Sequence, residues 1–326
     1  MTFRIFRGLG LAAALAALAG CATHTPPASQ PLVRRAPLAN NTAPAPLARE
    51  TSRAAAPADR NLVARAGAFE SYMRHARGID PAFSGANEVS QALQTGASHE
   101  TVELEGGMVA YAALAALQEP RFVAAVKADR SDLARRLAED PRAALNIAGG
   151  VAAGARASGA LYAQGVALSG QGERVKRAAY SVQHQGWSTA KVPDPGGRLA
   201  RVKRLSASAY QPSRDDPDHL QAALSEGARR AGPASPLVAR GVALAALSVL
   251  GEERQARGLM SEPKTASCLH MAKLNLYQCL ASAGPHYEDI YCLGQHAMID
   301  TGQCVVEATR AAPLRQASLT KASYGR

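Results

Sequence analysis

The cysteines are the residues whose chemistry and spacing say most about this 326-residue chain. Four of the five, Cys268, Cys279, Cys292 and Cys304, lie within the last sixty residues and are separated by spacers of ten, twelve and eleven residues. Structural zinc sites usually place two ligands within two to four residues of each other, and that spacing is missing here. The pattern therefore favours two disulfide bonds over a metal site, and with them an oxidising compartment.

Helix geometry restricts how these four cysteines can pair. If residues 268–279 form one helix, its two cysteines lie about 16 Å apart along the axis, whereas bridged Cα atoms lie within about 7 Å of each other. Two cysteines of one helix therefore cannot be joined. The stretch "SAGPH" (residues 282–286) is a turn signal and predicts an antiparallel helical hairpin. This arrangement pairs Cys279 with Cys292 beside the turn and Cys268 with Cys304 at the open end.

The second arm of the predicted hairpin contains a geometric mismatch. Eleven residues return to within about 20° of the same helix face, which suits Cys268 and Cys279. Cys292 and Cys304 are twelve residues apart and miss a common face by about 120°. We expect Gly302 to absorb this difference by ending the helix early. The pattern resembles twin-cysteine helical hairpins in general.

The hairpin segment also contains ionisable side chains that could bind a metal. Six of them lie between its first and last cysteine: His270, His286, Glu288, Asp289, His296 and Asp300. His296 and Asp300 are four residues apart and share a helix face, where surface pairing or core hydrogen bonding is their simplest role. A metal site is the alternative, but His-x-His and His-x-x-x-His spacings are missing. We predict no metal and no cofactor.

The fifth cysteine, Cys21, follows an apolar run near the start of the chain. Residues 1–20 carry Arg4 and Arg7, followed by the uncharged stretch "GLGLAAALAALAG". As a helix, this stretch is too short to span the roughly 30 Å hydrocarbon core of a bilayer, so it is typical of an export signal. No other stretch reaches eighteen uninterrupted apolar residues, and we predict no transmembrane helix.

The end of this leader resembles the lipobox of bacterial lipoproteins. Leu18-Ala19-Gly20-Cys21 places leucine, two small residues and cysteine directly behind the apolar run. The resemblance implies cleavage before Cys21, diacylglycerol on its thiol and acylation of the new amino group, and several acyl chains make a stable anchor. In that family an aspartate after the cysteine tends to retain the protein at the inner membrane. Ala22 therefore implies the outer membrane, facing the periplasm. A secretory signal with an incidental cysteine is the alternative.

Residues 21–60 are predicted to be the lipidated cysteine and a disordered tether rich in proline and alanine. Seven prolines and no aromatic residue lie between positions 22 and 60, so this segment cannot bury enough apolar area to offset its ordering entropy. As a flexible coil it would average roughly 35 Å from end to end. Its simplest role is that of a spacer, with wall or protein binding as the alternative. Residues 313–326 are likewise predicted to be a flexible tail.

The chain is basic, with a formal net charge of +11. Loss of Arg4 and Arg7 with the leader leaves +9. A basic exported protein favours anionic lipid, lipopolysaccharide or the carboxylates of peptidoglycan, whereas export excludes nucleic acid as a partner. The densest cluster, "RLARVKRL" (residues 198–205), places Arg198, Arg201, Lys203 and Arg204 around a short helix. A solvated helix face is the simplest interpretation, and a membrane or wall contact is the alternative.

The folded part is predicted to be all-α, with a helical body at residues 61–262 and the stapled hairpin at 263–312. Four residues are candidate helix N-caps, three of them directly before a proline: Ser98, Asp140, Asp216 and Ser235. Strand patterns are thin, although a short β-hairpin near "YSVQHQGWSTAKVPD" (residues 180–194) is an alternative. Gly154, Ser158 and Gly165 recur at helical spacings and predict closely packed helices.

Two stretches invite an enzymatic interpretation. In "FESYMRHARGIDPAFSGA" (residues 69–86), Glu70 and Ser71 precede Asp80-Pro81 and a Ser-Gly-Ala. The stretch resembles the catalytic segment of lytic transglycosylases, which implies Glu70 as a general acid acting on glycan. Its gap is several residues longer than in that family, and the Gly-Leu-Met-Gln element that should follow is missing.

The second is the pattern Ser-x-x-Lys, which occurs at Ser188–Lys191 and Ser318–Lys321. A lysine so placed deprotonates the serine in penicillin-interacting enzymes, but the Ser-Asp-Asn and Lys-Thr-Gly companions are missing. Nucleophile-elbow, P-loop and dinucleotide fingerprints are missing too. We therefore predict a non-enzymatic binding or structural role in the periplasm, with the membrane, peptidoglycan or envelope proteins as partners and no catalytic residue. A peptidoglycan-active enzyme using Glu70 is the alternative.

Overall fold

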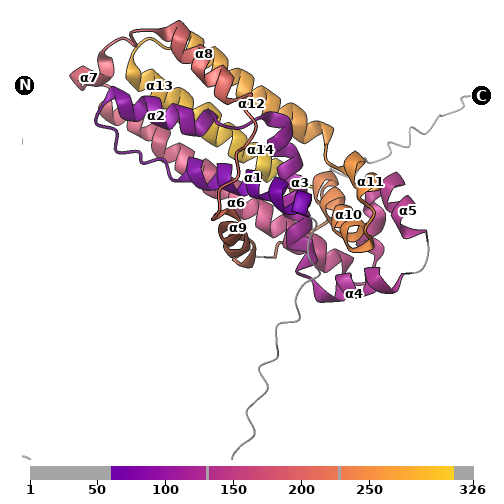
Figure 1. The fold of residues 1–326 in the computed structure, drawn as a ribbon. Helices are drawn as coiled ribbons and strands as arrows, with labels where there is room; N and C mark the ends of the chain where they lie inside the picture. Colours follow the sequence, from indigo (N-terminus) through magenta and orange to yellow (C-terminus); the bar gives the residue numbers. More distant parts are fainter. Residues whose placement is uncertain (1–59, 130–131, 227–228, 312–326) are drawn as a thin grey trace, which may run out of the picture. The chain divides into compact units, whose positions relative to one another are not determined.

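The fold is all-α, as predicted, in a computed structural model that describes residues 60–129, 132–226 and 229–311 (Figure 1). The predicted leader, Cys21, the tether and the tail from residue 313 lie outside the described residues. Within the described ranges, no helix combines the length and apolarity that a membrane span requires. The alternative of a β-hairpin at residues 180–194 is wrong. That segment contains the end of α6, the short helix α7 (Gly186–Thr189) and one isolated bridge between Lys191 and Pro285.

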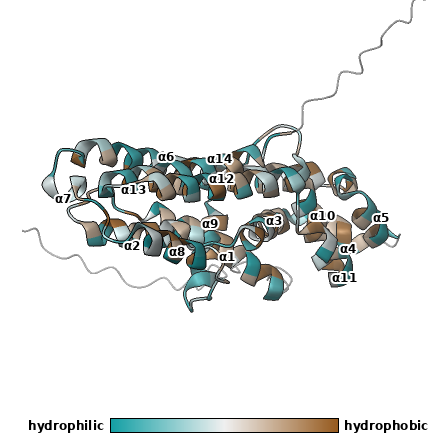
Figure 2. Cartoon of the chain, turned by 90° about the horizontal axis from the view of Figure 1, so that it is seen from above, coloured by the Kyte–Doolittle hydropathy of each residue, from teal (hydrophilic) through white to brown (hydrophobic). Residues whose placement is uncertain are grey.

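The core is built around two helices that are apolar on nearly every side. Every residue from Leu104 to Ala116 of α3 (Thr101–Leu117) is buried, and so are ten of the 15 residues of α10 (Pro236–Leu250). A helix that is hydrophobic all round belongs in a protein interior. The two helices pack against each other and against α6 (Gly150–Val182), and α3 also packs against α1 (Arg60–Arg77). Figure 2 shows brown, hydrophobic residues along both of them.

One of the four predicted N-caps is confirmed as an α-helical cap, at the start of α10. The Ser235 hydroxyl accepts a hydrogen bond from the Val238 amide at 3.1 Å, with Pro236 as the first helical residue. The prediction for Ser98 is wrong. α3 begins at Thr101, and the Glu100 carboxylate accepts from the Glu103 amide at 2.8 Å. Glu100 is therefore the cap, and its side chain takes the N3 amide that an N-cap residue usually serves.

Of the two aspartates, Asp140 is confirmed as a helix cap and Asp216 is not. Asp140 accepts from the Arg142 amide at 3.0 Å, but it starts the short 3₁₀ helix η1 (Pro141–Asn146) rather than an α-helix. Asp216 is itself the first residue of α9 (Asp216–Ser225). Its buried carboxylate binds the guanidinium of Arg74 at 3.0 Å instead of capping the helix. At this position an ion pair with Arg74 of another helix takes the place of the expected cap.

Smaller helices complete the body: α2 (Ala86–Ala97), α4 (Pro120–Ala128), α5 (Leu133–Glu139), α8 (Pro195–Leu205), α11 (Glu253–Ala256) and η2 (Arg257–Leu259). The C-terminal hairpin follows them. Its first arm is α12 (Pro263–Ser282), and its second arm consists of α13 (His286–Cys292), the π-helix η3 (Leu293–Asp300) and α14 (Thr301–Glu307). The second arm packs along both α12 and α6. It therefore lies between these two long helices (Figure 1).

Glycines bring the second arm and α6 into close contact at two levels. A Cβ atom at Gly165 would lie 2.7 Å from the carbonyl oxygen of Gly302. One at Gly172 would lie 2.9 Å from the carbonyl oxygen of Gly294 and 2.8 Å from the Met298 Cβ. These contacts leave no room for any side chain, which confirms the close packing expected at Gly165. They also fix the direction of the second arm, because residue numbers rise along α6 as they fall along the arm.

Candidate functional site

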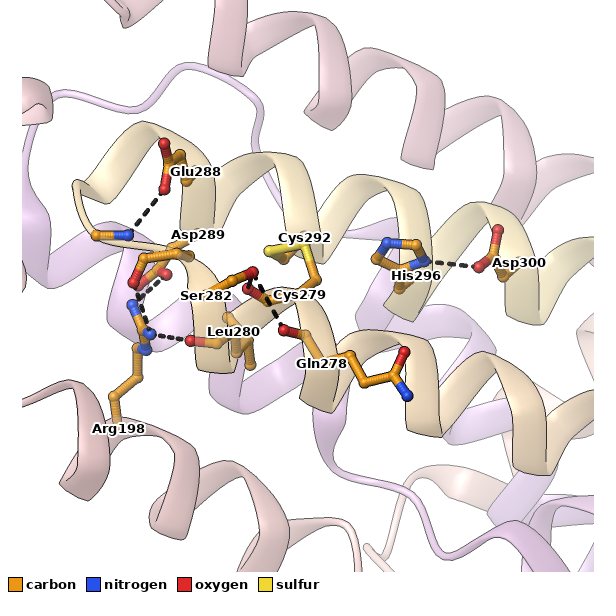
Figure 3. The surroundings of a disulfide bond; sticks show 12 residues. Arg198, Gln278, Cys279, Leu280, Ser282, Glu288, Asp289, Cys292, His296 and Asp300 are labelled. Atoms are coloured by element: carbon orange, nitrogen blue, oxygen red, sulfur yellow. Dashed lines mark hydrogen bonds and ion pairs between the residues drawn. A yellow bond between two sulfur atoms is a disulfide. The ribbon is translucent and has the colours of Figure 1, made fainter.

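The two disulfides pair as the sequence predicts. Cys279 is bonded to Cys292 beside the turn, and Cys268 to Cys304 at the open end, each with 5.6 Å between Cα atoms. Figure 3 shows the inner disulfide joining the two arms of the hairpin. Because the arms are antiparallel to each other and the second arm is antiparallel to α6, the helices α6 and α12 run in the same direction. Three helices side by side thus form one face, which we call the hairpin face.

The mismatch in the second arm is resolved by a π-helix, so the expectation about Gly302 is wrong. Residues 293–300 form η3, and Gly302 lies inside α14 rather than at a helix end. A π-helix closes its hydrogen bond at i+5 instead of i+4, so each of its turns takes up about one more residue. Twelve residues then complete about three turns, and Cys292 and Cys304 point to the same side. Gly302 instead allows the close approach of α6.

A buried ion pair connects α8 to the hairpin turn. The Arg198 side chain is only 5% exposed, so the expectation of a solvated position is wrong for this member of the basic cluster. Its guanidinium binds the Asp289 carboxylate, donates to the Leu280 carbonyl and donates to the Ala283 carbonyl at 3.1 Å (Figure 3). Burial raises the pKa of Asp289 to about 6, although the charge and hydrogen bond of Arg198 oppose that rise.

The rest of the basic cluster is exposed, as the simplest interpretation predicts. Arg201, Lys203 and Arg204 all face solvent from α8. Lys203 also places its ammonium 5.5 Å from the centre of the Tyr277 ring, a weak cation–π contact at an exposed site. Nothing in this geometry selects a membrane or wall contact over a solvated face.

His296 and Asp300 form the predicted surface pair on the second arm. The His296 Nδ1 lies 2.8 Å from a carboxylate oxygen of Asp300, whose other oxygen accepts from Gln295 at 2.9 Å (Figure 3). Burial raises the pKa of Asp300, but the hydrogen bonds from His296 and Gln295 outweigh it and leave the pKa below its usual value. Across the described residues, three or more His, Cys, Asp or Glu side chains nowhere meet in an arrangement that could hold a metal ion.

Two hollows lie along the hairpin face. The larger, of about 900 Å³, is an open groove over the middle of the face, and its lining includes Val166, Glu173, Met271, Asn275, Asp300 and Gln303. The smaller, of about 360 Å³, lies beside the inner disulfide at the turn. Between them, the Lys176 ammonium lies 3.2 Å from the Gln295 amide oxygen and forms a polar bridge across the face. The face thus offers one groove with apolar and polar walls and one smaller, aromatic hollow.

The aromatic hollow is lined by three tyrosines that the sequence analysis did not select. Tyr180 comes from the end of α6, while Tyr287 and Tyr291 come from α13. The rings of Tyr180 and Tyr291 meet edge to face, with centres 6.3 Å apart and planes at 82°. The spacing of Tyr287 and Tyr291 on one helix face was visible in the sequence, but their convergence with Tyr180 depends on tertiary packing.

The Glu70 side chain is buried in an ion pair. It is 2% exposed, and its carboxylate lies 3.3 Å from the Arg74 Nε. Arg74 in turn binds Asp216. Glu70 does not line either hollow of the hairpin face. A transglycosylase-type acid needs contact with the glycosidic oxygen, so the geometry gives this alternative no support.

The neighbouring serine and histidine contact each other and Arg74. Ser71 Oγ and His75 Nδ1 are 3.2 Å apart, and His75 Nε2 lies 3.3 Å from the Arg74 guanidinium. Ser188, of the first Ser-x-x-Lys match, is fully buried and donates to the carbonyl oxygens of Val182 and Gln185.

A separate polar cavity of about 120 Å³ lies near this pair. Its lining includes Ser71, Tyr72, His75, His99 and Tyr210. Burial, assisted by the charge of Lys273, lowers the pKa of His99 to about 3. The Nδ1 atom of this neutral, buried ring has no hydrogen-bond partner in the part of the chain described. The size and polarity of the cavity fit a few bound waters.

Comparison with known proteins identifies no relative of the chain, so its function is argued from the geometry. The chain matches no protein-family model, no curated protein and no solved structure.

Proposed function

We propose that the chain is a lipid-anchored protein of the bacterial cell envelope, attached through Cys21, whose helical body has a non-enzymatic binding or structural role. The observation that carries this proposal is the pair of nested disulfides. Disulfides of this kind persist in exported proteins and are rare in the cytosol. The leader at residues 1–20 supplies the route of export, and the lipobox-like sequence before Cys21 supplies the anchor. Ala22 favours the periplasmic side of the outer membrane.

The hairpin face is the surface we propose for binding. The inner and outer disulfides hold its two arms together, and glycine contacts hold the second arm against α6. A rigid face loses little conformational entropy when it binds a ligand. Its two hollows combine apolar side chains with a few polar groups, which is typical of ligand sites. Peptidoglycan and other envelope proteins are the partner classes within reach of a tethered body, and nucleic acid is not among them.

A localisation experiment tests the anchor. Replacing Cys21 with serine removes the only thiol available to the proposed lipid, so we expect the Cys21→Ser variant to move from the membrane fraction to the soluble fraction. The matched control is the double variant Cys279→Ser/Cys292→Ser, which removes two other thiols and should stay with the membrane. Membrane association of Cys21→Ser equal to that of the unchanged protein would contradict the proposal.

A further inference from the structure

The smaller hollow of the hairpin face, which we call the tyrosine hollow, has a lining with a definite electrostatic character. It occupies about 360 Å³, and Tyr180, Tyr287 and Tyr291 line it together with Gln183, Ser282 and Glu288. Tyr180 is 56% exposed, an unusual position for so large an apolar surface. The face of an aromatic ring carries the negative part of its quadrupole. Tyrosine rings therefore attract cations that approach their faces.

Glu288 is the one charged residue among those that line the hollow. One of its carboxylate oxygens accepts from the Gly284 amide at 2.8 Å, and the other accepts from the Tyr287 hydroxyl at 3.4 Å. A carboxylate has about four lone-pair sites, so acceptor capacity remains for a ligand. No lysine or arginine side chain takes part in the lining. Anions are thus disfavoured, and donors with positive charge are favoured.

Two long helices end at the hollow, α6 and α12. Ala179, Tyr180 and Gln183 belong to the end of α6, and Cys279, Ser282 and Ala283 to the end of α12. A helix C-terminus carries a partial negative charge of about half an electron, and a basic residue in the last turn usually compensates it. Neither α6 nor α12 has a basic residue in its last turn. The same is true of α2, α3, α9 and α10, whereas α1, α4, α5 and α8 each have at least one.

The positive charges near the hollow are already paired with negative groups. The start of α13 carries a partial positive charge, but Glu288 and Asp289 lie in its first turn. Arg198 is paired with the buried Asp289, and Figure 3 shows that pair reaching down from α13 while Glu288 points the other way. Arg198 also bonds the carbonyls of Leu280 and Ala283 at the end of α12. Arg198 therefore compensates the end of α12, which leaves the end of α6 as the helix terminus that adds negative potential to the hollow.

From these observations we infer that the tyrosine hollow binds an organic ammonium group. The ammonium lies against the tyrosine faces, near the Glu288 carboxylate and the carbonyl end of α6. Aromatic side chains with an adjacent carboxylate suit quaternary ammonium and alkylammonium ions alike. The inference deepens the proposed binding role and rests on it for the location of the ligand in the envelope.

Calorimetric titration of the purified full-length lipidated protein in neutral detergent tests the inference. The probes are choline, n-butylammonium and 3,3-dimethylbutan-1-ol, the uncharged carbon isostere of choline. We expect at least one of the two ammonium ions to bind and the isostere to bind about tenfold more weakly or not at all. Tighter binding of choline would assign a quaternary head group as the natural ligand. Tighter binding of butylammonium would assign a primary amine.

Matched variants locate the site. Tyr180→Ala removes one aromatic wall and should weaken ammonium binding about tenfold. Tyr162→Ala is the control, because Tyr162 is a partly exposed tyrosine of the same helix that lies outside the hollow, with its ring against Arg230. Glu288→Gln keeps an oxygen for the Gly284 amide but removes the charge, and should also weaken binding about tenfold.

Three results would overturn the inference, each measured on protein whose helical circular dichroism is unchanged. They are equal binding of choline and its isostere, equal losses in the Tyr162 and Tyr180 variants, and no binding of either ammonium ion. None of them depends on where the protein resides. A failure here therefore leaves the envelope proposal standing, and failure of the Cys21 experiment leaves the binding result standing.

Discussion

Arg198 shows how far a residue's role can depend on a distant partner. From sequence, Arg198, Arg201, Lys203 and Arg204 form one basic run, and each is equally suited to a solvated face. The structure separates them, because Arg198 points inward to Asp289, which lies 91 residues further along the chain. Local spacing assigns residues to helix faces, but it does not tell which charged residue of another helix lies opposite them. The buried pair could therefore not be predicted.

This pair makes stability depend on pH in a definite direction. Burial raises the pKa of Asp289 from 3.8 to about 6 in the folded protein, so the folded state binds this proton more tightly than the unfolded state. The contribution of Asp289 to the free energy of unfolding is therefore greatest below about pH 4. It declines as the pH rises through about 6, by on the order of 2–3 kcal/mol.

Asp289→Asn removes this titration and should flatten the decline between pH 4 and pH 7, although it also lowers stability throughout by leaving Arg198 unpaired. Urea unfolding at several pH values measures the effect. The control Asp218→Asn removes an exposed carboxylate of α9 and should keep the slope of the unchanged protein. Parallel curves for the Asp289 variant and the unchanged protein would show that Asp289 does not titrate in this range.

At the scale of elements, the hairpin shows which features the sequence can and cannot predict. Cysteine spacing, helix rise and one turn signal were sufficient for the hairpin and for both disulfide pairs, because all of these are local. The π-helix η3 was not predicted. The twelve-residue interval between Cys292 and Cys304 revealed the mismatch but not its solution, since ending the helix at Gly302 and widening its turns satisfy the same spacing. Contact with α6 is what requires Gly302 to remain inside a helix.

The same contact predicts a contrast between two glycines of α6. In Gly172→Ala the new Cβ would lie 2.8 Å from the Met298 Cβ and 2.9 Å from the Gly294 carbonyl oxygen, so the second arm must move away, at a cost of about 1–3 kcal/mol. In Gly170→Ala the new Cβ meets nothing within 4 Å, and the better helix propensity of alanine should raise stability by up to about 1 kcal/mol. Thermal unfolding of both variants measures the difference. A Gly172→Ala protein as stable as Gly170→Ala would refute the close helix contact.

Some residues of the candidate site could be predicted from the sequence, and others could not. The four C-terminal cysteines, His296 and Asp300 were predicted from the sequence, and the structure places these six residues on the hairpin. Tyr180 was not predicted, because nothing near the end of α6 indicates that α13 lies beside it. Glu70 was selected from a motif resemblance, and the structure places that side chain in a buried ion pair with Arg74. Motif spacing is a local property, whereas access to a substrate belongs to the whole fold.

At the scale of the whole molecule, the five cysteines are assigned two kinds of chemistry. One thiol, at Cys21, is proposed to carry lipid, and the other four are cross-linked in a rigid helical hairpin. Both fit the proposed export, and the net charge of +9 expected after the proposed loss of the leader suits a compartment lined with anionic lipid and wall polymers. If Cys21 carries lipid, four cysteines remain. An even number lets every remaining thiol form a disulfide, which an oxidising compartment favours.

Intact mass spectrometry of the protein isolated from membranes without reduction tests this central claim most directly. The account predicts a chain that begins at Cys21, carries diacylglycerol and an N-linked acyl group, and has lost four hydrogens through two disulfides. Proteolysis of the same sample should give a peptide pair linked between Cys279 and Cys292. A mass that includes residues 1–20, or four cysteines that react freely with alkylating reagent, would contradict the account.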